Sequence, residues 1–135
     1  MGDYTVKRVD EMERAFGGMW VRARASLGAT AFGLEIMDLA PGFPAGLYPK
    51  HTNEHGHEEV YIVLDGDGEM TLDTETVKLA PETLIRVGPA VARDIFPGPN
   101  GLRMLVISGT PGGAYNAPAR TELGGPEEEL GGSVA

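Results

Sequence analysis

Cysteine is absent from this chain of 135 residues, and its apolar residues form only short runs. The absence of cysteine excludes disulfide bridges, thiolate nucleophiles and cysteine-ligated zinc, and it is typical of a reducing compartment. The short apolar runs exclude a membrane-spanning helix, which needs about 20 consecutive apolar residues. The N-terminal segment also has none of the apolar character of a secretory signal. We therefore expect a soluble, cytoplasmic protein.

Basic residues are scarce as well, since 11 Lys and Arg stand against 20 Asp and Glu, for a formal net charge of -9. A protein of this charge repels polyanions, so nucleic acids and acidic membrane surfaces are not expected as partners. The length fits a single domain. A hydrophobic content of 41% is ordinary for a globular protein.

Glycine and proline are frequent, with 20 and 10 copies, and they fall between the short apolar runs. This pattern is typical of an all-β domain with many turns. One short helix is predicted over residues 9–16, where Asp10 could cap the first turn and Glu13 could complete a capping box. The strands that we predict after it cover residues 19–25, 31–39, 58–65, 69–73, 76–79, 83–87, 92–96 and 102–108.

Two turns are predicted between these strands. The sequence Asp65-Gly66-Asp67-Gly68 predicts a tight hairpin, because Asp-Gly pairs favour two-residue turns between strands. A weaker signal at Thr74-Glu75 predicts a second turn. From residue 110 onward the composition changes to Gly, Pro, Ala and Glu, which bury too little apolar surface to offset the entropy of ordering. We expect at least residues 124–135 to be mobile, or to be ordered only on a partner subunit.

All three histidines, His51, His55 and His57, lie within seven residues of one another. Side chains two residues apart in an extended segment face the same side, so His55, His57 and Glu59 would form one row. Two imidazoles and a carboxylate are suitable ligands for a divalent transition metal. The alternative is a solvated polar loop before a strand. Three histidines beside an evenly spaced glutamate favour metal or ligand binding.

The same segment resembles the first motif of the cupin superfamily, which reads Gly, five residues, His-x-His, three or four residues, Glu, six residues, Gly. Glu59 and Gly66 fit the end of this motif, and residues 58–68 are similar to the third and fourth strands of a cupin barrel. The resemblance covers about residues 32–108. It implies an all-β double-stranded β-helix, or jelly-roll barrel, around a central pocket.

The resemblance also implies a plan for the whole chain. Residues 1–18 would form an N-terminal arm with the short helix, residues 19–109 the cupin barrel, and residues 110–135 a mobile tail. Since cupins commonly pair their N-terminal strands, it further implies a homodimer.

The histidine half of the motif departs from the family pattern. Counting back from Glu59 places His55 at the second ligand position and Asn53 at the first, with His57 as an extra residue. An insertion could bring His51 into the first position instead. The resemblance thus implies His55 and Glu59 as the foremost metal ligands, followed by His57 and then His51.

The second cupin motif reads Gly, five residues, Pro-x-Gly, two residues, His, three residues, Asn. Residues 82–97 keep its length and apolar rhythm, but its five positions hold Glu82, Gly88, Ala90, Arg93 and Pro97. Arg93 therefore stands where the third metal histidine belongs. A guanidinium stays protonated and does not bind a cation, so a shell of three histidines and a glutamate is excluded.

Two interpretations of Arg93 remain open. In the first, a metal is held by His55, by His57 or His51, by Glu59 and by water, while Arg93 binds an anionic substrate or an outer carboxylate. In the second, Arg93 pairs directly with Glu59 across the barrel and supplies the neutralising charge itself. The three histidines favour the first interpretation.

The predicted function is accordingly a small-molecule-binding cupin with one divalent transition metal, namely iron, manganese, nickel, copper or zinc. It would be an oxygenase, isomerase or cyclase acting on an apolar or aromatic metabolite. Arg93, Tyr61, Arg86 and Met104 would contact the ligand. The alternative is a metal-free binding or sensing module built around the Arg93–Glu59 pair.

Overall fold

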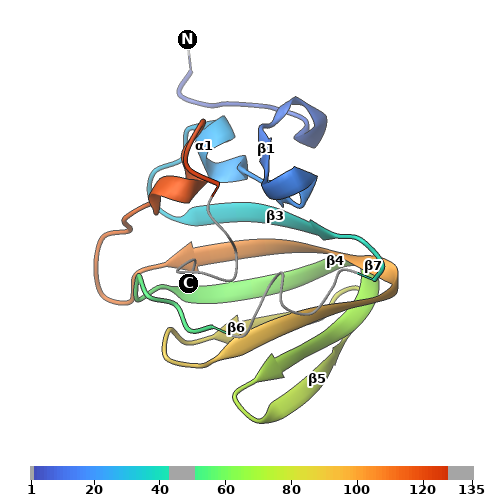
Figure 1. Cartoon of the computed structure of the whole chain (residues 1–135). Helices are drawn as coiled ribbons and strands as arrows, with labels where there is room; N and C mark the ends of the chain where they lie inside the picture. Colours follow the sequence, from blue (N-terminus) through green and yellow to red (C-terminus); the bar gives the residue numbers. More distant parts are fainter. Residues whose placement is uncertain (1, 43–50, 128–135) are drawn as a thin grey trace.

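Seven antiparallel strands build one sheet in the computed structural model, which describes residues 2–42 and 51–127. Their order is β1-β2-β3-β7-β4-β5, and β6 pairs with β4. The strands are β1 (Arg14–Ala15), β2 (Trp20–Val21), β3 (Gly33–Leu39), β4 (Glu58–Leu72), β5 (Glu75–Leu79), β6 (Leu84–Val87) and β7 (Arg93–Gly109). The helical segments are α1 (Ala23–Leu27) and the 3-10 turns η1 (Val9–Glu11), η2 (Phe16–Gly18) and η3 (Ala119–Thr121). The all-β prediction is confirmed, although the sheet is not closed into a complete barrel (Figure 1).

The hydrophobic core lies on the concave face of the sheet. Tyr61 and Val63 on β4, and Met104 on β7, point to this face because side chains two residues apart share one side of a strand. Met37 on β3 and Met70 on β4 complete the centre of the core, and these five side chains are at most 2% exposed. Complete burial of each such side chain stabilises the fold by about 1.5–3 kcal/mol.

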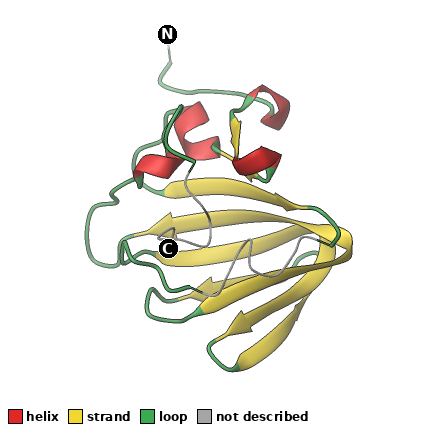
Figure 2. Ribbon diagram, in the orientation of Figure 1, coloured by secondary structure: helices red, strands yellow, loops and turns green. Residues whose placement is uncertain are grey.

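The N-terminal segment around α1 and the last described residues lie together beside β3, where the helical segments gather (Figures 1 and 2). Buried Arg22 donates hydrogen bonds to the backbone oxygens of Arg120, at 2.9 Å, and Gly125, at 3.1 Å. The backbone N–H of Gly124 donates to the Glu13 carboxylate at 2.8 Å. For residues 124–127 we expected mobility or order on a partner subunit, and the structure shows contacts of Gly124 and Gly125 with residues of their own chain. Residues 128–135 of that prediction lie outside the described residues.

The helix predicted over residues 9–16 is wrong. Only the single turn η1 forms there, and its backbone bonds run from the N–H of Glu11 to the Arg8 carbonyl and from the N–H of Met12 to the Val9 carbonyl, both at 3.0 Å. Glu13 does not cap a helix, because its carboxylate is paired with Arg22 and accepts from Gly124. The α-helix is instead α1, part of which we predicted as strand. The contacts of Glu13 with Arg22 and Gly124 therefore outweigh the local sequence signal for a capped helix.

The hairpin predicted at residues 65–68 is also wrong, since β4 continues through them. Each half of β4 pairs with a half of β7, so the two long strands run together along their length. Gly66 lies at an irregularity of this ladder, opposite Leu102, with a φ of 83°. Gly66 thus allows β4 to bend. Glycine serves irregular strands as well as tight turns. The weaker turn, predicted at Thr74-Glu75, forms one residue earlier, since residues 73–74 connect β4 to β5.

Replacing Gly66 by Ala is expected to lower the free energy of unfolding by about 2–3 kcal/mol. A Cβ atom there would lie 2.1 Å from the backbone oxygen of Gly101, and the residue would keep a positive φ. Gly28→Ala is the matched control, because Gly28 has a φ of 77° but no atom within 4 Å of the added Cβ. Urea unfolding should show a loss of only about 1 kcal/mol for the control. Equal losses for both variants would contradict the close approach of the two backbones.

The structure shows no helix that is long and apolar enough to cross a membrane within the described residues.

Candidate functional site

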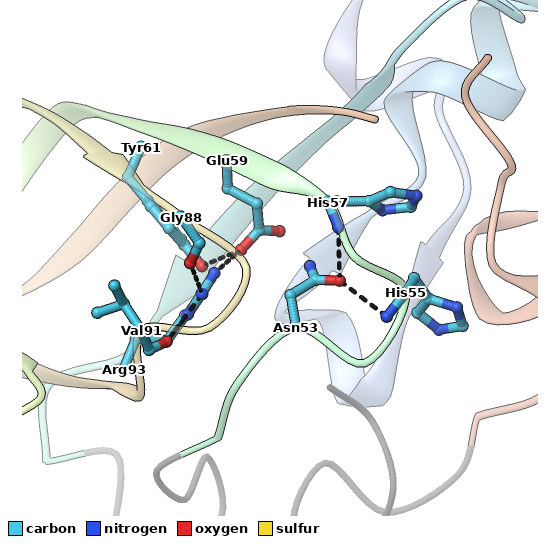
Figure 3. A network of polar contacts seen from close by, with 8 residues as sticks. All are labelled: Asn53, His55, His57, Glu59, Tyr61, Gly88, Val91 and Arg93. Atoms are coloured by element: carbon cyan, nitrogen blue, oxygen red, sulfur yellow. Dashed lines mark hydrogen bonds and ion pairs between the residues drawn. The ribbon is translucent and has the colours of Figure 1, made fainter. Parts of the chain in front are cut away.

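Polar side chains gather on the concave face at the end of the sheet where β4 begins. Glu59 and Tyr61 share the inward side of β4 with Val63. Ser108 of β7 lies opposite Glu59, and Val106 lies opposite Tyr61. Arg93 begins β7 in the other half of the long ladder, and the curvature of the sheet brings its side chain to Glu59 (Figure 3).

Arg93 is completely buried and forms hydrogen bonds in several directions. Its Nη1 donates to Oε1 of Glu59 at 2.6 Å, and its Nη2 donates to the Gly88 carbonyl at 2.6 Å. Nε and Nη2 both donate to the Val91 carbonyl, at 3.2 and 2.9 Å. The Tyr61 hydroxyl donates to the same Glu59 oxygen at 2.7 Å. Of the two interpretations of Arg93, the structure therefore has the one in which Arg93 pairs directly with Glu59.

The turn after β6 places the two carbonyls that hold Arg93. The N–H of Val91 donates to the Gly88 oxygen at 3.2 Å, which closes the turn. His51 then pairs with Arg93 through two backbone hydrogen bonds, of 2.9 and 2.8 Å. These contacts fix the backbone of Arg93 on both sides, so that its guanidinium is directed at Glu59.

Asn53 organises the loop that carries His55 and His57. Its Oδ1 accepts the backbone N–H groups of His55, at 3.0 Å, and His57, at 3.1 Å. The two imidazole rings are stacked with their centres 5.8 Å apart, and they turn away from the Glu59 carboxylate (Figure 3). Nε2 of His55 lies 3.3 Å from Nη1 of Arg120. Partial burial and the positive charge of Arg120 lower the pKa of His55.

The predicted metal ligands do not form a metal-binding set in this geometry. Within the described residues no three His, Asp or Glu side chains are placed to hold one metal ion. Glu59 uses Oε1 for Arg93 and Tyr61, and His55 directs Nε2 at Arg120. His51 is brought beside Arg93 only through its backbone bridge. These donor atoms therefore do not fit a mononuclear metal centre.

The remaining ligand-binding candidates lie in different places. Tyr61 contacts Glu59 directly, and Met104 is fully buried in the core below it. Arg86 faces the opposite side of the sheet, since its neighbour Val87 points inward. Its side chain is 67% exposed and pairs with exposed Glu58. The structure therefore separates Arg86 from the group around Arg93.

Glu35 and Tyr115 are site residues that the sequence analysis missed. Glu35 lies on β3 opposite Val106, only 5% exposed, and burial raises the pKa of its carboxyl to about 8. A signal existed for Glu35, because it stands among the apolar residues 34–37 at an inward position of a strand. Tyr115 lies in the segment after β7, which we expected to be a tail, and no sequence pattern selects it.

Tyr115 lies between the histidine loop and the polar residues of the sheet. Its ring centre lies 4.8 Å from that of His57, and its hydroxyl is hydrogen-bonded to Ser108. The pKa of Tyr115 is raised by burial, despite this hydrogen bond. His57 is only 3% exposed, and burial together with the neighbouring His55 lowers its pKa. The imidazole of His57 is therefore neutral near pH 7.

Comparison with known proteins identifies the class to which this arrangement belongs. No protein family model matches the sequence, and no curated protein matches it. Among solved structures, a cupin protein from Bacteroides fragilis matches with a TM-score of 0.67 and 25% identity, over 87% of this chain and 93% of that one. The cupin domain of Schizosaccharomyces pombe Cnp3 matches with a TM-score of 0.53 and 17% identity, over 59% of this chain and 56% of that one.

A variant of Streptomyces PAC13, in a structure with uridine, matches with a TM-score of 0.61 and 18% identity, over 86% of each chain. The fold is thus that of the cupins. The 25% identical neighbour supports membership of the cupin superfamily, in agreement with the resemblance of the first motif.

Proposed function

We propose that this protein is a metal-independent cupin that binds a small molecule at the end of its sheet. The Arg93–Glu59 ion pair takes the place of the metal ion. The observation that supports this proposal is the contact of 2.6 Å between Arg93 and Glu59, made by a guanidinium that is fully buried. The metal-binding alternative would require Glu59 and His55 to release their present partners, and the imidazoles of His55 and His57 to turn toward the Glu59 carboxylate.

The guanidinium of Arg93 supplies the positive charge that a metal cation would supply beside Glu59. It neutralises the Glu59 carboxylate, whose side chain is 17% exposed, and the Tyr61 hydroxyl donates to the same oxygen. The apolar side chains of Met104 and Val106 continue the inward face behind these groups. A few fixed polar groups over an apolar surface are the usual features of a site for a small organic ligand. A homodimer remains a prediction for this protein.

Metal content is the direct test of this proposal. Tag-free protein is stripped with chelator, loaded separately with iron, manganese, nickel, copper and zinc, desalted and measured by mass spectrometry. We expect well below one equivalent of each metal per chain, because Oε1 of Glu59 is held by Arg93 and Tyr61 and the imidazoles of His55 and His57 turn away from that carboxylate. The double variant His55→Ala/His57→Ala serves as the control and should retain the same background content.

About one equivalent in the wild type, lost in the double variant, would contradict the proposal. It would instead favour the interpretation of the protein as a metal-dependent oxygenase, isomerase or cyclase.

A further inference from the structure

Buried polar atoms at the same end of the sheet lack hydrogen-bond partners within the described part of the chain. Among them are both carboxyl oxygens of Glu35 and the Nε2 atom of His57, and Nε1 of Trp20 and the Nε atoms of Arg24 and Arg120 also lack partners. Glu35 and His57 are 5% and 3% exposed. Burial of a polar group without a hydrogen bond is unfavourable, and such groups in native proteins call for an explanation. A bound ligand that supplies the missing partners would provide one.

Glu35 faces the interior of the sheet, and His57 lies at the end of the sheet before β4, with Tyr115 between them. Glu35 shares one row across the sheet with Val106 and Tyr61. Ser108 and Glu59 form the next row, and His57 precedes Glu59 by two residues. Tyr115 connects the two ends, since its ring contacts His57, its hydroxyl bonds Ser108, and its pKa responds to the charge of Glu35.

The hydrogen-bonding character of each group follows from its surroundings. His57 donates one ring N–H to the backbone oxygen of Asn116, so Nε2 carries a lone pair and acts as an acceptor. Because its pKa is about 8, Glu35 is largely protonated at pH 7, and its carboxyl can both donate and accept. The indole N–H of Trp20 favours the charged form of Glu35 but falls short of hydrogen-bond geometry. It is one more donor near the same place.

The charges around Glu35 disfavour a charged ligand. A cation would approach Arg22, Arg24 and Arg120, whose charges already act on Glu35. Arg22 and Arg24 are paired with Glu13 and Glu122, so they do not offer a free counter-charge for an anion. Arg120 forms no ion pair within the described residues and lies 3.3 Å from Nε2 of His55, so an anion near Glu35 would depend on Arg120 alone for its counter-charge. An anionic group would also disfavour ionisation of the neighbouring Glu35 further.

We propose that Glu35 and His57 bind an uncharged polar ligand that carries both a hydrogen-bond donor and an acceptor, such as a carboxamide. This proposal rests on the proposed function and names the ligand class of the same site. The ligand N–H donates to Nε2 of His57, and the Glu35 carboxyl exchanges hydrogen bonds with the rest of the amide. The side chains of Tyr61 and Val106 contact the apolar part of the ligand.

Three probes of similar size and different charge test this proposal on the full chain at pH 7. They are benzamide, benzoate and benzylammonium, and their dissociation constants are measured by titration followed by NMR. Acetamide, acetate and methylammonium repeat the comparison without the ring, so that size does not decide the result. We expect each amide to bind at least about tenfold more tightly than its charged analogues.

Glu35→Met and His57→Phe should each weaken amide binding at least about tenfold, since each removes the polar atoms and keeps similar volume. Glu69→Met is the matched control for Glu35, because Glu69 is exposed on β4, and it should leave the affinity unchanged. If Glu35→Met does not fold, Glu35→Gln replaces it, and it should retain amide binding because it keeps a donor and an acceptor.

Equal binding of the amide and its charged analogues would overturn the proposal, as would absence of amide binding or normal affinity in Glu35→Met and His57→Phe. Each of these results leaves the proposed function intact if metal content stays at background. Amide binding that requires a loaded metal would instead contradict the proposed function itself.

Discussion

Replacing Arg93 by Met is expected to lower the free energy of unfolding at pH 7 by about 3–5 kcal/mol. Arg93 is fully buried, and its removal leaves the Glu59 carboxylate without its counter-charge. The Val91 carbonyl loses the hydrogen bonds from Arg93, and the Gly88 carbonyl loses one of its two donors, in the same step. Methionine fills a similar length of side chain, so the loss reports mainly on the charge and the hydrogen bonds. Urea unfolding of both proteins measures it.

Arg86→Met provides the matched control for this prediction. Arg86 also pairs with a glutamate of β4, but both side chains are exposed, at 67% and 43%. Exposed ion pairs contribute about 0–1 kcal/mol, so the control should change little. In the Arg93→Met background, a further Glu59→Gln substitution should recover part of the loss, since it removes the unpaired charge. A loss for Arg93→Met no larger than that of the control would contradict a buried ion pair.

Replacing Glu35 by Gln is expected to stabilise the protein at alkaline pH by up to about 5 kcal/mol. Burial raises the pKa of Glu35 from 4.5 to about 8, although Arg24, Arg120 and Arg22 favour its charged form. The folded protein therefore holds a proton on Glu35 that the unfolded chain releases between these two pH values. Stability from this group is fully present below pH 4.5 and is lost as the pH rises through about 8. Glutamine is neutral at every pH and avoids this loss.

Unfolding free energies measured from pH 4.5 to 9 check this prediction. The difference between Glu35→Gln and the wild type should be near zero at pH 4.5 and should grow until the pH exceeds about 8. Glu69→Gln is the control, because this exposed side chain should give a profile parallel to that of the wild type. Parallel profiles for Glu35→Gln and the wild type would show that Glu35 is not buried in the manner described.

The β architecture could be predicted from sequence because alternating apolar residues and frequent turn residues are local signals. The inward positions of Tyr61 and Met104 follow from that alternation. The hairpin at residues 65–68 could not be predicted correctly, since Asp-Gly pairs serve both tight turns and irregular strands. Only the pairing of β4 with the distant β7 distinguishes these two uses. The N-terminal helix failed for a related reason, because Glu13 is held by Arg22 and Gly124.

Residues of the candidate site could be predicted from sequence where they stand at positions of a cupin motif. Glu59 and Arg93 were selected in this way, and their direct contact was one of two interpretations that the sequence left open. Tyr115 could not be selected, because its contact with His57 depends on the path of the segment after β7. Glu35 carried a weak signal, an acidic residue at an inward strand position, which alone does not define a partner.

The sequence by itself determined the fold class, the absence of cysteine chemistry, the excess of negative charge and the presence of an arginine where the second cupin motif has a histidine. Each of these depends on composition or on neighbouring residues. Only the tertiary structure decided that Arg93 meets Glu59 and that Glu35 lies at the same end of the sheet as His57. Those arrangements depend on how a curved sheet brings residues from distant strands together, and local sequence does not specify that curvature.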